Sequence, residues 1–552
     1  MKLTEPLSKA FSVFGWPGPR PQQEAVFEAI LSGADVAAVL PTGMGKSALY
    51  QVPALARRGC VVVVSPLIAL MIDQVDALTA LGVRVASLNS TITDTERRAT
   101  LAAIEAGALD LLYLSPERLA VTEPSIFEHL PVQMIAVDEA HCLSEWGWDF
   151  RPVYRDLARI FGRIWPERRP QVLALTATAT DEVFSDICTV LQLRAPVTFR
   201  YSPNRPNIFV GVVGARVELA RMVGRGGLPC VVYSSTRLGT EAAAHELQHA
   251  GYKAAHYHAG MRKEDRRKAQ EDFQSGAVEV LCATTAYGMG VDGVIRSVVH
   301  EQMPTSLEAY AQESGRGGRD RQPALSIVRA TAEALDVAQG FVEMTWPRPK
   351  TVRRFWILLK RWFELDVARW EKEGQIHRTN AQIGDRMGMD PAVVGSCLRI
   401  LIDAGNLRRT GYADRPCKAV LNPRRHELRG RRQRAVIAKL EEFANSRDEV
   451  IGSVKFFRDV CDLDLDYAKQ LNTKDALRYE WAERVQVLEL VDDGPAAFAD
   501  DDLHAIAERQ RQRILAARQF LYEASCRRRY LMDYFSDFTL ETGGPDCCDL
   551  CA

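Results

Sequence analysis

Short apolar runs alternate with amphipathic stretches from residue 35 to about residue 330. The runs are rich in β-branched residues and are continuous: Val36–Leu40, Val61–Val64, Leu111–Leu114, Met134–Val137, Val172–Leu175, Cys230–Tyr233 and Val280–Ala283. Such runs are typical of parallel strands that helices cover on both faces, so we predict an α/β fold. Nearly 300 residues exceed one sheet of this kind, and residues 201–207 (YSPNRPN) predict a linker between two lobes.

The pattern changes after about residue 345. Segments 351–372 and 503–535 have the periodicity of amphipathic helices rich in Arg, Trp and Phe. Residues 376–412 predict a helix, a turn, a second helix and a short strand, with Thr379 as the first helix cap. This winged-helix-like pattern suits a module that binds duplex DNA; a module that binds protein or serves as a scaffold is the alternative.

Composition places the chain among ordinary folded proteins. Of 552 residues, 47% are hydrophobic and 26% are charged, which excludes a mostly disordered or collagen-like chain. The longest apolar stretch, near residues 61–72, is too short to span a bilayer. Residues 1–15 lack the pattern of a secretory signal. We therefore expect no membrane partner and a cytoplasmic location, on the nucleoid in a bacterium and in the nucleus of a eukaryote.

The net charge of −1 mildly disfavours a nucleic-acid partner, but it is an average over several domains. Residues 407–439 contain eleven Lys or Arg and two acids, a local charge of +9. This segment suits either a stripe that binds phosphates or a solvated helix face.

The strongest local motif is LPTGMGKS at Leu40–Ser47, directly after an apolar run. A strand, a glycine-rich turn and a helix aim several backbone N–H groups at one point, where a triphosphate can bind. Lys46 would neutralise the β- and γ-phosphates and Ser47 would bind Mg²⁺. The strict pattern has Gly where this chain has Leu40, and an ordinary strand–turn–helix corner is the alternative.

Two further motifs complete a phosphoryl-transfer site. Asp138 and Glu139 end the apolar run 134–137, where Asp138 would hold the Mg²⁺ shell and Glu139 would orient or deprotonate the attacking water. Arg316 and Arg319, in the segment QESGRGGR, could reach a γ-phosphate bound by the other lobe and stabilise transition-state charge. Taken singly, a strand-end Asp-Glu pair suits a solvated corner, and Arg-x-x-Arg suits a surface pair.

Together these motifs resemble, in order over residues 10–330, the superfamily 2 helicases and within them the RecQ family. The resemblance implies two RecA-like motor lobes that clamp ATP. It implies that Gln23 reads adenine and that Arg20 supports the nucleotide. The remaining positions that it implies for nucleotide binding are Thr42, Gly43, Met44, Gly45 and Gln312.

The segment LSEWGWDFRP at 143–152 points most narrowly to RecQ. Aromatic side chains next to an arginine suit stacking on unpaired bases, although a hydrophobic hinge between lobes is the alternative. In the family this aromatic-rich loop couples single-strand binding to ATP hydrolysis. The residues that the resemblance implies for DNA contact are Pro66, His141, Trp146, Trp148, Phe150, Arg151, Thr176 and Thr284. The family usually has His where this chain has Trp148.

The twelve cysteines are unevenly placed: eight are scattered and four lie in the last 27 residues. Cys526, Cys547, Cys548 and Cys551 could close a tetrahedral Cys₄ zinc site. They resemble the RecQ zinc motif with two departures, because two ligands are adjacent and about 170 residues separate the motif from the motor lobes. Cys461 could replace one of the adjacent pair, and a cluster of reactive thiols without metal is the other possibility.

We therefore predict an α/β fold of two RecA-like parallel-sheet lobes, followed by a mainly helical region with a winged-helix-like module and a small zinc module. The predicted divisions are an ATP-binding lobe at 1–205, a second lobe at 206–345, a helical and winged-helix-like region at 346–440, and a helical region ending in the zinc module at 441–552. The resemblance implies an ATP-, Mg²⁺- and Zn²⁺-dependent helicase acting on DNA, both single strands and duplex junctions, with 3′ to 5′ travel and a role in repair or recombination. The alternatives are an ATP-driven duplex translocase that separates no strands and a nucleotide-gated DNA-binding regulator.

Overall fold

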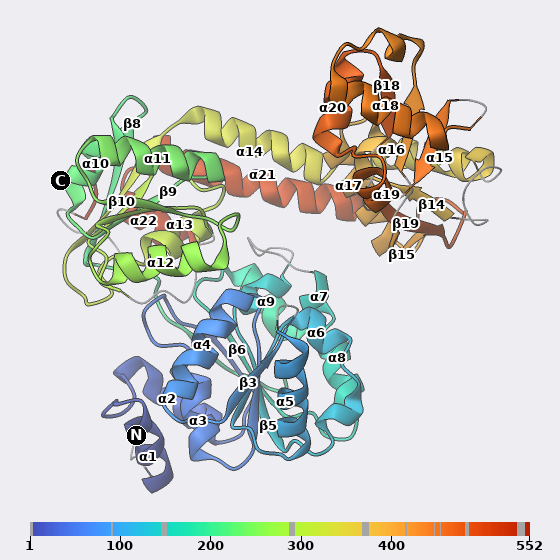
Figure 1. Cartoon of the computed structure of the whole chain (residues 1–552). Helices are drawn as coiled ribbons and strands as arrows, with labels where there is room; N and C mark the ends of the chain where they lie inside the picture. The colour runs from blue at the N-terminus through green and yellow to red at the C-terminus, as the bar shows by residue number, and fades with distance from the viewer. Residues whose placement is uncertain are drawn as a thin grey trace. The chain divides into compact units, whose positions relative to one another are not determined.

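The computed structural model describes residues 4–89, 92–144, 152–285, 287, 293–366, 375–413, 417–445, 448–452, 454–480, 485–537 and 547–552. The chain forms two compact units (Figure 1). Unit 1 comprises residues 1–338 and 509–552, and unit 2 comprises residues 339–508.

The first lobe of unit 1 is built on a parallel sheet whose strands lie in the order β3-β4-β2-β5-β6-β1-β7. The strands are β1 (Val36–Val39), β2 (Cys60–Val64), β3 (Val85–Leu88), β4 (Leu111–Leu114), β5 (Val132–Val137), β6 (Gln171–Thr176) and β7 (Val197–Arg200). Two apolar cores cover the two faces of this sheet, because successive side chains of each interior strand point to opposite faces.

Helices pack on both faces of this sheet (Figure 1). They are α1 (Glu5–Val13), α2 (Pro21–Leu31), α3 (Ala48–Ala56), α4 (Ile68–Ala80), α5 (Asp94–Glu105), α6 (Pro116–Ala120), α7 (Pro152–Arg155), α8 (Leu157–Ile164) and α9 (Asp181–Val190), with 3₁₀ turns η1 (Pro124–Phe127) and η2 (Ala140–Leu143). Helices α1 to α4 contribute to one core, and α5, α8 and α9 contribute to the other.

The second lobe of unit 1 has a parallel sheet in the order β10-β11-β9-β12-β13-β8. Its strands are β8 (Ile208–Gly214), β9 (Cys230–Tyr233), β10 (Ala254–Tyr257), β11 (Val280–Ala283), β12 (Ser297–His300) and β13 (Ala324–Ala330). Its helices are α10 (Leu219–Gly226), α11 (Arg237–His249), α12 (Lys263–Gln274), α13 (Leu307–Ser314) and α14 (Ala332–Thr345). The prediction of two parallel-sheet lobes is confirmed, and residues 201–207 join them without helix or strand.

The cysteine-rich end of the chain returns to the second lobe. The predicted helix at 503–535 is two helices, α21 (Asp500–Tyr522) and α22 (Arg527–Tyr534). Arg518 on α21 forms an ion pair with Asp336 on α14, and these two helices run side by side (Figure 1). Val210 on β8 forms a parallel bridge with Cys548. The cysteine segment is therefore part of unit 1, and unit 2 is an insertion that begins within α14 and ends within α21.

Unit 2 contains two small antiparallel sheets, in the orders β14-β19-β15 and β17-β16-β18. Its strands are β14 (Gln375–Arg378), β15 (Leu407–Ala413), β16 (Cys417–Leu421), β17 (Glu449–Gly452), β18 (Leu477–Glu480) and β19 (Val485–Leu490). Its helices are α15 (Pro349–Asp366), α16 (Asn380–Met387), α17 (Pro391–Asp403), α18 (Arg431–Phe443), α19 (Val454–Asp459) and α20 (Leu465–Thr473), with the 3₁₀ turn η3 (Pro423–Glu427).

The helix–turn–helix predicted at 376–412 corresponds to α16, α17 and β15. The Thr379 hydroxyl accepts the Gln382 N–H at 3.2 Å, which completes a capping box, and Gly388 ends α16 at φ 64°. Strand β19 pairs between β14 and β15, so this module needs residues up to 490. The predicted border at residue 440 therefore lies inside unit 2. Duplex binding by this module stays a prediction.

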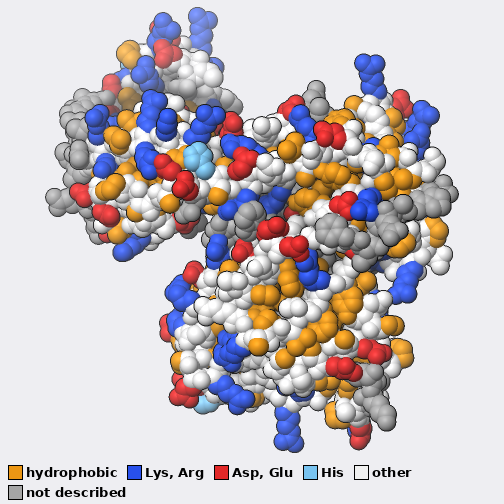
Figure 2. Space-filling view, turned by 180° about the vertical axis from the view of Figure 1, so that it is seen from behind, with side chains coloured by type: hydrophobic (Ala, Val, Ile, Leu, Met, Phe, Trp, Pro, Cys, Tyr) orange, Lys and Arg blue, Asp and Glu red, His pale blue; other side chains and the backbone are white. Residues whose placement is uncertain are grey.

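Acidic side chains from elsewhere in unit 2 partly neutralise the basic segment 407–439. Among the described residues, five of its basic side chains form ion pairs with acids that all lie outside it: Arg408 with Glu489, Lys418 with Glu449, Arg424 with Asp475, Arg425 with Glu441 and Asp448, and Arg432 with Asp462. Figure 2 shows unit 2 at the upper left, with acidic side chains interspersed among basic ones. This arrangement favours the interpretation of the segment as a solvated helix face.

Among the described residues, no helix has the length and apolar character needed to cross a bilayer.

Candidate active site

A cavity of about 490 Å³ in unit 1 contains most of the predicted nucleotide-binding residues. Both lobes line it. The first lobe supplies Arg20, Thr42, Gly43, Gly45, Lys46, Ser47, Asp138 and Glu139, and the second supplies Gln312, Arg316 and Arg319. Residues almost 300 positions apart in the sequence therefore meet at one place, as a clamp between two lobes requires.

The glycine-rich loop between β1 and α3 has a fixed shape. Gly43 and Gly45 adopt φ of 86° and 77°, which favours glycine at both positions. The Gln23 amide donates to the carbonyl oxygens of Met44 at 2.9 Å and Gly45 at 3.0 Å, and Arg20 Nη1 donates to the Gly43 carbonyl at 2.5 Å. A Cβ atom on Gly45 would lie 2.7 Å from Gln23 Nε2. Because these carbonyls are held from behind, the loop is preorganised to receive phosphates.

Gln23 is 3% exposed and does not line the cavity. Its side-chain oxygen accepts the Arg20 backbone N–H at 2.9 Å, so both ends of its amide are engaged. The side chains at the rim of the cavity are instead Phe14 and Trp16, whose rings stack with centroids 4.6 Å apart. This flat pair offers a stacking surface for a base. Adenine recognition by Gln23 stays a prediction.

Asp138 and Glu139 lie at the end of β5, each 5% exposed. Burial and the charge of the neighbouring Glu139 raise the pKa of Asp138, and the positive charge of Lys46 partly offsets this rise. Burial would also raise the pKa of Glu139, but the hydrogen bond from His141 and the charges of Lys46 and Arg316 bring it below its ordinary value. Two adjacent buried carboxyl groups are costly without cations nearby, so this pair suits a magnesium-phosphate site.

His141 connects this carboxylate pair to strand β6. Its Nδ1 atom lies 3.3 Å from Glu139 Oε2 and 2.9 Å from the Thr176 hydroxyl. Thr176 in turn donates to the Thr178 carbonyl at 3.1 Å. His141 is 2% exposed and Thr176 is 1% exposed. These two predicted DNA-contact residues are therefore buried, and their geometry favours a link behind the site over a direct contact with DNA.

The second lobe brings a buried cation to the cavity. Arg316 is 2% exposed, and its Nε and Nη1 atoms have no hydrogen-bond partner among the described residues. A Cβ atom on Gly43 would lie 3.5 Å from Arg319 Cγ, so Arg319 packs over the glycine-rich loop. Gln312 is buried at 6% exposure on the preceding helix α13. A buried guanidinium with donors to spare fits a polyanion such as a triphosphate.

The four terminal cysteines form one cluster. The Sγ atoms of Cys526, Cys547, Cys548 and Cys551 all lie within 4.8 Å of one another. Cys526 Sγ is 3.6 Å from that of Cys547 and 3.9 Å from that of Cys548. Four sulfurs about 2.3 Å from a tetrahedral zinc ion lie about 3.8 Å apart, so the cluster fits Zn²⁺ despite its adjacent pair.

The thiols of the cluster perturb one another. Against the effect of burial, backbone N–H groups of Leu550 and Arg527 donate to the Cys548 sulfur and lower its pKa to about 7. Burial and the neighbouring thiols raise the pKa of Cys547, and the neighbouring thiols raise the pKa of Cys551 to about 11. Cys461, the alternative ligand, is fully buried in the apolar core of unit 2 that contains Phe457 and Leu471. The cluster does not need it.

A second group with metal-ligand chemistry, Glu241, His256 and His258, lies on α11 and at the end of β10. The Gly260 N–H donates to His258 Nδ1 at 3.2 Å, which leaves the ring proton on Nε2, 2.9 Å from Glu241 Oε1. Because Nε2 is then a donor rather than a ligand, His258 and Glu241 form a structural hydrogen-bonded pair beside His256.

The remaining predicted DNA contacts are less defined. Pro66 is buried, and Thr284 is half-buried with its backbone N–H donating to the Tyr257 carbonyl at 3.2 Å. Trp146, Trp148, Phe150 and Arg151 lie outside the described residues. Their roles stay predictions.

Comparisons with known proteins agree on the two lobes. The DEAD/DEAH box helicase family matches residues 20–187, and the helicase conserved C-terminal domain matches residues 218–321. The ATP-dependent DNA helicase RecQ of Pasteurella multocida is 41% identical over 323 residues, which are 57% of this chain and 51% of that protein. The probable ATP-dependent DNA helicase RecS of Bacillus subtilis is 38% identical over 354 residues, which are 62% of this chain and 70% of that protein.

The fold has a counterpart among solved structures. The crystal structure of the DUF1998 helicase MrfA bound to DNA and AMPPNP matches with a TM-score of 0.51 and 18% identity, covering 74% of this chain and 61% of that one. This likeness concerns the fold. The chain spans about half the length of the Pasteurella relative, and the similarity to both curated relatives covers little more than the two lobes.

Proposed function

The chain belongs to the RecQ family of superfamily 2 helicases, and from this premise we propose that it is a DNA helicase that hydrolyses ATP to separate the strands of duplex DNA. The observation that carries the proposal is the shared cavity, where the glycine-rich loop and the Asp138–Glu139 pair face Arg316 and Arg319 of the other lobe. Because each lobe supplies part of this site, ATP hydrolysis requires the two lobes to close on the nucleotide. This requirement couples ATP hydrolysis to movement of the lobes.

Each group has a distinct task in this proposal. The loop N–H groups and Lys46 bind the β- and γ-phosphates, and Phe14 and Trp16 stack on the base. Glu139 orients the attacking water; its lowered pKa keeps it ionised, so it accepts a hydrogen bond from that water. Arg316 and Arg319 stabilise the negative charge on the γ-phosphoryl oxygens as the bond between the γ-phosphorus and the leaving oxygen lengthens.

Two metals fit the residues present. Ser47 and Asp138 would hold Mg²⁺, which neutralises phosphate charge when bound. The four terminal cysteines would hold Zn²⁺ in a closed site with no position for a substrate, which gives this metal a structural role.

DNA is the proposed partner, and the finer assignments rest on the family. We propose 3′ to 5′ travel along one strand, with Pro66, Thr284 and the aromatic segment 143–152 on the tracking side, and a role in repair or recombination. The link from Glu139 through His141 to Thr176 supports coupling between the ATP site and that side.

A strand-displacement assay on duplexes with a 3′ or a 5′ single-stranded tail tests the proposal. We expect ATP- and Mg²⁺-dependent displacement of the 3′-tailed substrate, and none with Glu139→Gln. DNA-stimulated hydrolysis without displacement of either substrate would indicate a duplex translocase. Equal, slow hydrolysis by wild type and Glu139→Gln would indicate a nucleotide-gated DNA-binding regulator. Either result would contradict the helicase assignment.

A further inference from the structure

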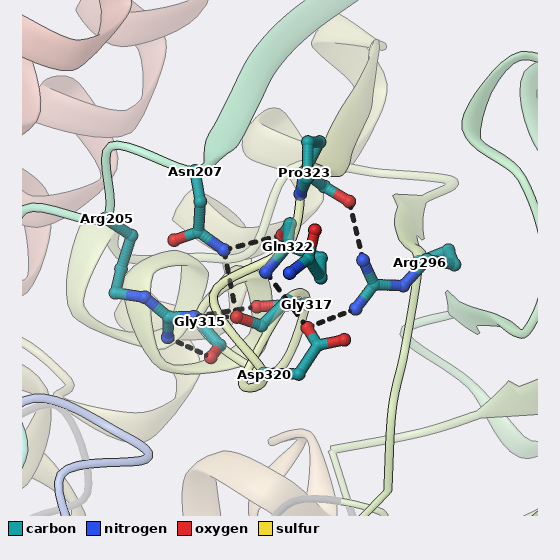
Figure 3. Close-up of polar contacts among 9 residues, drawn as sticks. Arg205, Asn207, Arg296, Gly315, Gly317, Asp320, Gln322 and Pro323 are labelled. Atoms are coloured by element: carbon teal, nitrogen blue, oxygen red, sulfur yellow. Dashed lines mark hydrogen bonds and ion pairs between the residues drawn. The ribbon is translucent and has the colours of Figure 1, made fainter.

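The loop that follows α13, residues 315–323 and here called the arginine loop, carries both Arg316 and Arg319. Its backbone is held by side chains from two other segments (Figure 3). Arg296 donates to the Pro323 carbonyl at 2.8 Å and pairs with Asp320 at 2.5 Å. Asn207 donates to the carbonyls of Gly318 and Gln322, both at 2.9 Å. These contacts fix the far end of the loop within the second lobe.

Arg205 holds the near end, and it comes from the linker between the lobes. Its Nη1 donates to the Gly315 carbonyl at 2.7 Å, and its Nη2 donates to those of Gly317 at 2.9 Å and Gly318 at 2.8 Å (Figure 3). Nη1 also lies 3.4 Å from the carbonyl of Thr42 in the glycine-rich loop. One guanidinium therefore binds the backbone on both sides of Arg316 and also contacts the glycine-rich loop of the first lobe.

The electrostatic setting of Arg205 is unfavourable by itself. Burial and the positive charges of Arg319 and Arg321 lower the pKa of Arg205. Placing a third cation beside two others costs free energy, and the carbonyl groups offset that cost. A polyanion in the cavity would relieve the repulsion further, so the cluster of cations suits a loop that receives phosphate.

Arg205 is itself anchored from behind by the cysteine-rich segment. Arg528 on α22 is 5% exposed and donates to the Arg205 carbonyl at 2.9 Å, the Ile208 carbonyl at 2.7 Å and the Asn204 side chain at 3.1 Å. The same guanidinium lies 3.3 Å from the carbonyl of Cys547. The contacts thus run without a break from the cysteine cluster through Arg528 and the linker to the arginine loop.

We propose that Arg205 is a positioning residue that holds the arginine loop in the geometry needed for γ-phosphate transfer. It touches no reacting atom and acts through Arg316 and Arg319. The proposal rests on the ATP hydrolysis proposed above. Fork-shaped binding of several carbonyls requires the planar guanidinium, because a lysine ammonium presents one point of attachment.

The test compares Arg205→Ala, Arg205→Lys and the control Arg225→Ala, which removes an exposed arginine from the end of α10. DNA-stimulated ATP hydrolysis gives kcat and KM, and titrations give the affinities for AMPPNP and for ADP with aluminium fluoride, which mimics the transferring phosphoryl group. We expect kcat of Arg205→Ala to fall by about 10- to 100-fold, since misplacing a catalytic group by about 1 Å costs up to about 100-fold. KM and AMPPNP affinity should stay within about twofold, and affinity for the aluminium fluoride complex should fall with kcat.

We expect Arg205→Lys to lie between wild type and Arg205→Ala, and Arg225→Ala to match wild type. An unchanged kcat in Arg205→Ala, or a raised KM with unchanged kcat, would overturn the positioning role while leaving the proposed function intact. A wild-type protein without ATP hydrolysis would instead overturn the proposed function. Should Arg205→Ala fail to fold, Arg205→Lys decides: wild-type kcat and aluminium fluoride affinity contradict the proposal, and a joint fall in both supports it.

Discussion

Replacing Thr176 by valine should weaken both the protein and its ATP hydrolysis. The hydroxyl of Thr176 has one proton, which it donates to the Thr178 carbonyl at 3.1 Å. Its oxygen must therefore accept from His141 Nδ1 at 2.9 Å, which places the ring proton on Nδ1. The same nitrogen lies 3.3 Å from Glu139 Oε2, within ion-pair distance, so His141 stands between Thr176 and Glu139.

The magnitude follows from these contacts. Valine has nearly the shape of threonine, so packing is kept and two buried hydrogen bonds are lost at about 0.5–1.5 kcal/mol each. The unfolding free energy should fall by about 1–3 kcal/mol. With Thr176 gone, the imidazole turns wholly to Glu139 and shifts the carboxylate that orients water. A disturbance of about 1.4 kcal/mol in that orientation lowers kcat by about tenfold.

The assay is ATP hydrolysis with and without single-stranded DNA, beside thermal unfolding. Thr240→Val is the matched control, because Thr240 is 0% exposed, its hydroxyl donates to the Arg237 carbonyl at 2.6 Å, and neither residue lines the cavity. It should lose stability without losing kcat. If Thr176→Val retains wild-type kcat, or if both variants lose kcat equally, the His141 link plays no part in hydrolysis.

Four further outcomes are expected. Glu139→Gln should lower kcat by at least about 100-fold while fluorescence anisotropy gives an unchanged affinity for single-stranded DNA. Gly45→Ala should weaken nucleotide binding by about tenfold or more in a titration, because its Cβ would meet Gln23 and its φ of 77° disfavours alanine. Cys526→Ala should lower the zinc content measured by metal analysis and lower the Tm; unchanged zinc would refute the Cys₄ site. Thr379→Ala should cost about 1 kcal/mol in urea unfolding with unchanged kcat, since it removes only a helix cap.

The apolar pattern predicted most of the interior strands and none of the edge strands. The predicted runs correspond to β1, β2, β4, β5, β6, β9 and β11, all of which have neighbours on both sides. The four edge strands, β3, β7, β8 and β10, were not among them, and neither were the interior strands β12 and β13. In β7, Val197 and Thr198 are exposed and Phe199 is half-buried, so an edge strand mixes polar and apolar residues and leaves no continuous run.

The residues of the site likewise fall into those that local sequence predicts and those that only tertiary contacts place. Asp138 and Glu139 follow β5 directly, and Lys46 lies in the glycine-rich loop between β1 and α3, so local sequence predicted where they lie. Gln23 and Arg205 bind backbone carbonyls of distant loops, and such contacts leave no local pattern. The charge of +9 over residues 407–439 could not show its ion pairs for a related reason: Glu489, Asp475 and Asp462 reach this segment only through the tertiary fold.

The order of segments in the sequence also changes meaning in the fold. A zinc motif about 170 residues beyond the motor lobes suggests a rearranged C-terminal region, yet α21 and α22 return the chain to the second lobe. Arg528 then binds the backbone of the linker at 204–208, and Asp549 N–H donates to the Val210 carbonyl at 3.0 Å. Because loop-closure entropy grows only slowly with length, a folded insertion between α14 and α21 costs little. The motor lobes and the cysteine cluster therefore form one structural unit, although residues 339–508 lie between them in the sequence.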